Sequence, residues 1–249
     1  MNLIIQNYNL LVDDYQLIED SVTETDIQKK REILHSIFSI LASCQIKPTQ
    51  VKNAVSAHKL LEKTKCIQAQ IVKLQSVESS LEAKEYLDIL VQRKQKLEEK
   101  LHKFSKRKKL KFPAIKKNKV DKDRIYRKFD KYFYKLIERL SIESIEDAED
   151  ILSVQVKFNK FQTIVEVLSY IDKIDRTKLE KLRLYQEAFE EILNFEALIQ
   201  NMKKFYKKAK PAEEAIIETL ELTQNVLIEG FDNQKGVIIN DCRAVILLK

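Results

Sequence analysis

The residues from Lys103 to Lys119 form the stretch of this sequence whose side chains point most directly to a chemistry. They read KFSKRKKLKFPAIKKNK and hold nine lysines and arginines but no acidic residue. Ammonium and guanidinium groups donate charge-assisted hydrogen bonds to phosphate oxygens. The whole chain carries a formal charge of +7, so the remainder is slightly acidic and the positive charge is focal. A focal basic region predicts a polyanionic partner, and the alternative is a solvated connector between helices.

Residue types that catalyse reactions form no recognisable motif in this sequence. His35, His58 and His102 are far apart and lack the spacing of a helical metal site. Two glycines are too few for a glycine-rich phosphate loop. The acidic stretch SIESIEDAED, residues 141–150, is typical of a helix start rather than of a magnesium site. We therefore predict a protein that is not an enzyme and that uses no cofactor and no metal.

Cysteine usage and hydropathy predict a cytoplasmic protein. Cys44, Cys66 and Cys242 are widely spaced and form no redox or metal motif, which favours reduced thiols. No apolar run approaches the roughly 20 residues that cross a bilayer, so stable membrane insertion is not expected. The first residues also lack the basic start of a signal peptide.

The elements that must position the basic residues are predicted to be helices. Only two glycines and three prolines interrupt a chain rich in Leu, Ile, Lys and Glu. Apolar spacing predicts helices over residues 2–19, 24–44, 48–76, 80–109, 121–141, 145–173, 177–208 and 212–231. Leucines and a phenylalanine at positions 87, 90, 97, 101 and 104 form the seam of an antiparallel bundle. The tail from 236 to 249 fits either a helix or an extended segment.

The chain shows a weak internal repeat. A shift of 128 residues sets residues 61–71 on residues 189–199 and aligns Ile37 with Val165. The pattern indicates two similar helical halves, about 1–110 and 121–249, within a single domain that spans residues 1–249. The basic connector, residues 103–120, then lies between the halves.

Two of these segments resemble motifs of CHAD domains (conserved histidine α-helical domains). In LEKTKCIQAQIVKLQ, residues 61–75, Leu61, Lys65 and Ile71 take the places of a leucine, an arginine and a second leucine of the family's third helix. Residues 189–199 are similar to its counterpart in the second half, and residues 86–104 resemble the helix that follows in the first half. The resemblance covers about residues 22–232. It implies an all-α fold of two pseudo-symmetric antiparallel helical bundles.

The same resemblance implies non-catalytic binding of inorganic polyphosphate, or of another polyanion, in a basic groove. The family's histidines are missing here, because residues 23–34 and 152–164 contain none. Basic residues near those places and in the other matching helices are the predicted ligands: Lys29, Lys30, Arg31, Lys65, Arg93, Lys157 and Lys160. The basic connector is predicted to extend this field at the rim through Lys103, Lys106, Arg107, Lys108 and Lys109.

Two other functions remain open from the sequence. Nucleic acid is a rival ligand, because Phe104 and Phe112 within the basic residues offer rings for base stacking. A chain that has lost the family histidines is also expected to fit a protein-interaction scaffold. Five aromatic residues between 126 and 134 are too dense for one buried stripe, so the helix is either buried on all sides or covers an interface.

Overall fold

The computed structural model describes residues 3–18, 23–77, 83–107, 110–141, 144–171, 174–207 and 211–245, without the side chains of residues 24, 105–107 and 118. This part of the chain contains eight α-helices, two 3₁₀ turns and no strand, which confirms the predicted all-α class. The helices are α1 (Leu3–Leu17), α2 (Glu24–Ser43), α3 (Lys52–Gln75), α4 (Lys84–Arg107), α5 (Lys122–Leu140), α6 (Ala148–Ser169), α7 (Arg176–Phe205) and α8 (Pro211–Ala244). The turns are η1 (Pro48–Val51) and η2 (Lys117–Lys119).

Short polar side chains set several helix starts. The Thr23 hydroxyl accepts a hydrogen bond from the Asp26 amide at the start of α2. Asp121 accepts one from the Arg124 amide ahead of α5, at 3.0 Å. Asp147 caps α6, which therefore begins at Ala148, three residues later than predicted. Ahead of α6, the Ile145 amide instead donates to Asp232, at 2.9 Å.

Helix α8 is longer than the sequence predicted. The expected end was residue 231, beside Gly230, but α8 continues to Ala244. Neither glycine has a positive φ, so both fit a helical backbone. The continued helix buries Ile238 and Cys242, and this burial outweighs the low helix propensity of glycine. Of the two alternatives for the tail, a helix or an extended segment, the structure shows a helix up to Ala244.

The chain divides into two compact units that do not coincide with the two sequence halves. Unit 1 comprises Met1–Lys65, Gln95–Lys131 and Phe161–Asp175. Unit 2 comprises Cys66–Lys94, Tyr132–Lys160 and Arg176–Lys249. The prediction of a single domain with a repeated half stays a prediction.

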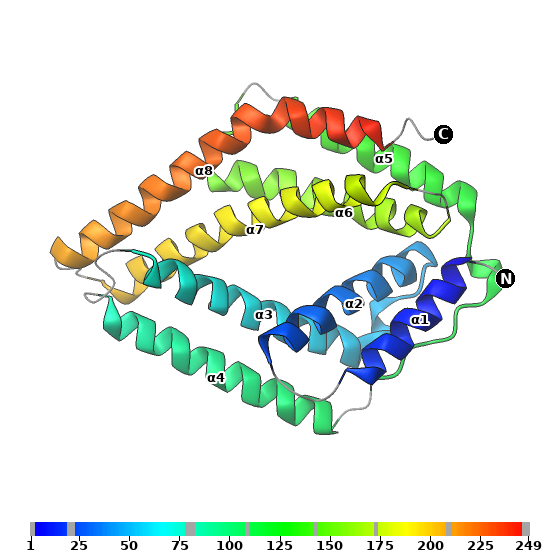
Figure 1. Cartoon of the computed structure of the whole chain (residues 1–249), viewed down its shortest axis with the longest axis horizontal. Coiled ribbons are helices and arrows are strands. Elements are labelled where there is room, and N and C mark those ends of the chain that lie inside the picture. Colours follow the sequence, from blue (N-terminus) through cyan, green and yellow to red (C-terminus); the bar gives the residue numbers. More distant parts are fainter. Residues whose placement is uncertain are drawn as a thin grey trace. The chain divides into compact units, whose positions relative to one another are not determined.

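Each unit has its own buried core. In unit 1, the Phe129 ring of α5 lies 5.5 Å from the Phe161 ring of α6, and α2 is buried along Leu34, Ile37 and Leu41. In unit 2, α7 and α8 lie side by side (Figure 1). The Phe189 ring of α7 lies between the rings of Phe158 and Phe231, with centroid distances of 5.1 and 4.8 Å. A second group of buried apolar residues surrounds Tyr86 near the end of α7.

The aromatic residues of α5 differ in how deeply they are buried. Phe129 and Phe133 are buried, while Tyr126 and Tyr132 are half-buried. Tyr134 is 71% exposed, so the helix is not buried on all sides.

Candidate polyanion-binding surface

The basic connector is docked on α1 by its apolar residues. From residue 110 the chain runs without regular structure to η2 and then enters α5, and Figure 1 shows this stretch beside α1. The hydroxyl of Tyr8 in α1 donates a 2.8 Å hydrogen bond to the carbonyl of Pro113. The Phe112 ring meets the Tyr15 ring edge-on at 5.9 Å, and Ile115 is buried. The described part of the connector therefore has a fixed backbone within unit 1.

The lysines of this docked stretch remain at the surface. Lys111, Lys116, Lys117 and Lys119 are all exposed. In the described part of the chain, none of these four ammonium groups is paired with a carboxylate. The connector thus combines a backbone held by apolar anchors with exposed cations, a residue type that can donate hydrogen bonds to anionic oxygens.

Helix α5 continues the positive charge in a way that the sequence reasoning missed. Arg124, Arg127 and Lys131 stand at spacings of three and four residues, which places them on one helix face. The buried residues Ile125 and Phe129 mark the opposite face. This spacing was visible in the sequence, but the prediction stopped at the connector. We call these three residues, with Lys111, Lys116, Lys117 and Lys119, the 111–131 cations.

Two neighbouring features limit this array. Lys128 does not join it, because its ammonium group donates to the Ala42 carbonyl at the end of α2, at 3.3 Å. Burial, and then the charge of Arg124, lower the pKa of Lys128. Asp121, Asp123 and Asp130 lie in the same stretch of sequence, and Asp121 is engaged as the α5 cap. Basic residues still outnumber acidic ones in residues 110–131.

Five of the predicted ligands whose side chains are described lie in unit 1. Lys29 and Lys103 are exposed, and Lys30 and Lys65 are half-buried. Lys103 pairs with Glu99 one turn away, at 3.7 Å. Arg31 is only 12% exposed, and its Nη1 lies 3.5 Å from the Glu62 carboxylate, so its guanidinium is already engaged with an anion of the chain itself.

Three other predicted ligands lie in unit 2. Arg93 and Lys160 are exposed, and Lys157 is half-buried. The predicted ligands are thus distributed over both units, and their convergence on one groove stays a prediction. The side chains of Lys106 and Arg107, and the whole of Lys108 and Lys109, lie outside the described residues.

The aromatic rings of the basic connector are not open platforms. Phe112 is occupied by its contact with Tyr15, and Phe104 is half-buried on α4. Base stacking needs an accessible ring face, so this packing weakens the case for nucleic acid.

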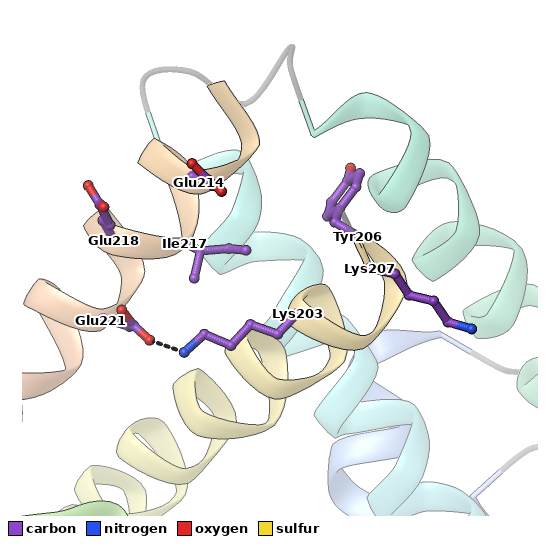
Figure 2. Close-up of a pocket in the computed structure, with 7 residues that line it drawn as sticks. All are labelled: Lys203, Tyr206, Lys207, Glu214, Ile217, Glu218 and Glu221. Atoms are coloured by element: carbon purple, nitrogen blue, oxygen red, sulfur yellow. Dashed lines mark hydrogen bonds and ion pairs between the residues drawn. The ribbon is translucent and has the colours of Figure 1, made fainter. Parts of the chain in front are cut away.

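A shallow cavity of about 410 Å³ lies in unit 2, where α7 ends and α8 begins. Figure 2 shows Lys203 reaching across to Glu221, with which it forms an ion pair, while Lys207 points away. Glu214 and Glu218 line the α8 side, and Ile217 lies between the two helices. Three carboxylates beside two lysines do not suit a polyanion, and no pattern in the sequence predicted this cavity.

Two further properties concern only the residues that the structure describes. No helix among them is both long and apolar enough to span a bilayer. No group of three or more His, Cys, Asp or Glu side chains among them is arranged to hold a metal ion.

Comparisons with known proteins bear on the fold. No family model matches the chain, and no curated protein matches it by sequence. Among solved structures, it is similar to the crystal structure of the CHAD domain from the plant Ricinus communis, with a TM-score of 0.67 and 12% sequence identity. The match covers 97% of this chain and 89% of the plant chain. At this low identity the match is evidence for the fold only. The structural similarity confirms the prediction made from residues 61–75 and 189–199: the chain has a CHAD-like all-α fold.

Proposed function

We propose that the protein binds a polyanion without catalysis, and that its ligand is inorganic polyphosphate. The observation that carries the proposal is the docked connector, which holds unpaired lysines on a backbone fixed by Tyr8, Phe112 and Ile115. A flexible loop would lose conformational freedom on binding, and prior docking removes much of that cost. The CHAD-like fold supports the proposal, because the family is one that binds polyphosphate.

The layout of the 111–131 cations favours a linear ligand. The five residue steps from Lys111 to Lys116 span at most about 17 Å. The seven steps from Arg124 to Lys131 cover about 10 Å along α5. A compact phosphorylated molecule reaches only a few of these cations, whereas a chain of phosphates can follow them.

The predicted ligands outside this array take different places in the proposal. Lys29, Lys30, Lys65 and Lys103 belong to the same unit and are retained as further contacts. Arg31 is a weaker candidate, because phosphate must compete with the Glu62 carboxylate. Arg93, Lys157 and Lys160 contribute only if the ligand also reaches unit 2.

The proposal is tested by removing four lysines of the docked connector. A variant with Lys111, Lys116, Lys117 and Lys119 all changed to Ser is titrated with long-chain polyphosphate at 50 and 200 mM salt. Each lost phosphate contact reduces the slope of log affinity against log salt by about 0.7, by analogy with single-stranded nucleic acid. We expect a slope shallower by up to about 3 and at least tenfold weaker binding at low salt.

A matched control separates a site from general charge. Lys63, Lys84, Lys204 and Lys207 are exposed lysines elsewhere in the chain, and changing all four to Ser removes the same charge. This control is expected to retain most of the affinity. Equal losses in both variants, or no loss in the connector variant, exclude the connector as the site.

An interaction scaffold is the second candidate function. Tyr134 is exposed on α5, and Leu222 and Val226 are exposed one turn apart on α8. Such side chains suit a protein partner. Absence of salt-sensitive binding to polyphosphate and to single-stranded RNA in the same titration favours the scaffold, and a preference for RNA favours the nucleic-acid alternative. The cytoplasmic location stays a prediction from the sequence.

A further inference from the structure

Helices α2, α3 and α6 of unit 1 meet around a cluster of charged and titratable side chains. His35 Nε2 lies 3.9 Å from Glu166 Oε2, and His58 Nε2 lies 3.5 Å from Glu62 Oε1. The two imidazole rings are 6.4 Å apart. We call the set formed by Arg31, His35, His58, Glu62 and Glu166 the histidine cluster.

The histidine cluster is partly shielded from water. His58 is 20% exposed and Glu166 is 17% exposed, whereas His35 and Glu62 are 38% and 43% exposed. The Phe38 ring packs edge-on against His58 at 5.4 Å. The Ser36 hydroxyl donates a 2.8 Å hydrogen bond to Glu166 Oε1, but Glu166 Oε2 and His58 Nε2 are buried without a hydrogen bond among the described residues.

The charges of this cluster do not balance when both imidazoles are neutral. Within the five residues of this set, the two carboxylates of Glu62 and Glu166 are then offset by one cation, Arg31. One proton on an imidazole restores the balance. A second proton places two imidazolium rings 6.4 Å apart beside Arg31, with only two carboxylates to offset three cations. Like charges at such distances repel, and the burial of His58 weakens the screening by water on its side of the pair.

We infer that protonation of both imidazoles of the histidine cluster loosens the contacts of α2, α3 and α6 in unit 1, so that unit 1 opens in acid. Charged neighbours from all three helices enter this balance: Arg31 and His35 from α2, Glu62 from α3 and Glu166 from α6. Burial first, and then the charges of His35 and Arg31, lower the pKa of His58 from 6.5 to about 4. This inference does not depend on what unit 1 binds.

The coupling between the two imidazoles is tested by NMR titration of the full chain. The protein contains three histidines, so the Cε1–H signals can be assigned by single His→Gln variants. His102 on the exposed side of α4 serves as the internal control. In His35→Gln, loss of the neighbouring charge is expected to raise the titration midpoint of His58 by at least half a pH unit. An unchanged His58 midpoint in a folded His35→Gln variant overturns the coupling.

A second measurement uses the wild-type chain and needs no variant to fold. Hydrogen exchange followed by mass spectrometry compares pH 7.0 with pH 5.0, after correction for intrinsic exchange rates. Peptides from residues 24–43 and 52–65 are expected to open at least tenfold more often at pH 5.0. Peptides from residues 176–205 and 211–244 of unit 2 are expected to change little. Equal changes in both units, or no change in unit 1, contradict the inference.

Discussion

Replacing Tyr8 by Phe removes one hydroxyl and keeps the ring, which makes it a clean test of the docked connector. Tyr8 is only 2% exposed, and its hydroxyl donates to the Pro113 carbonyl at 2.8 Å. Burial first, and then Cys44, raise the pKa of Tyr8 to about 12, so the hydroxyl keeps its proton at every pH that suits the assay. A net hydrogen bond contributes about 1 kcal/mol, and a partly buried carbonyl left without a donor costs somewhat more.

We therefore expect Tyr8→Phe to lower the free energy of unfolding by about 1–2 kcal/mol. Equilibrium urea denaturation measures this change, and hydrogen exchange of residues 110–120 shows whether the connector undocks more often. A loss of about 1.4 kcal/mol corresponds to a tenfold rise in local opening. Tyr134→Phe is the matched control, because this tyrosine is 71% exposed. If Tyr8→Phe is as mild as the control and leaves connector exchange unchanged, the hydrogen bond does not hold the connector in place.

Three further predictions concern other parts of the molecule. Because the pKa of His58 is about 4 when folded and 6.5 when unfolded, the unfolded chain binds more protons in between and stability falls as the pH drops through this window. Urea denaturation at pH 7.5 and 4.5 should show a loss of about 2–3 kcal/mol in the wild type, which His58→Gln should lack. Gly230→Ala should stabilise the protein by about 1 kcal/mol in the same assay, because the added methyl meets no atom within 4 Å and favours the helix. Maleimide should label Cys66 first in the native protein, since Cys44 and Cys242 are buried and burial raises their pKa values to about 11 and about 12; prompt labelling of all three cysteines would count against the described packing.

Much of the fold could be predicted from the sequence because the signals are local. Scarce glycine and proline, with apolar residues at helical spacing, located all eight helices to within a few residues at most boundaries. The main error was the end of α8, which was predicted at residue 231 and lies at Ala244. A glycine costs a helix about 1 kcal/mol, and that local cost is outweighed when residues beyond it, such as Ile238, enter a core.

The candidate site was predictable only in part, because its decisive contacts join distant residues. The charge of the connector is visible in the sequence, but Tyr8 and Pro113 are 105 positions apart. Ser36 and Glu166 are separated by 130 positions, so no local sequence pattern predicts the histidine cluster. The engagement of Arg31 with Glu62 is hidden for the same reason. Composition indicates which charges are present, whereas tertiary contacts decide which of them are available to a ligand.

Segments of the two units alternate along the sequence, and this order affects how the nascent chain folds on the ribosome. Unit 1 includes Phe161–Asp175, and unit 2 includes α8. During translation, the apolar faces of α1 and α2 therefore remain exposed until about 175 residues have been synthesised, because unit 1 is incomplete before then. Fragments cut within the connector would contain neither unit whole, so splitting the gene there should yield two insoluble pieces that recover only when they are made together.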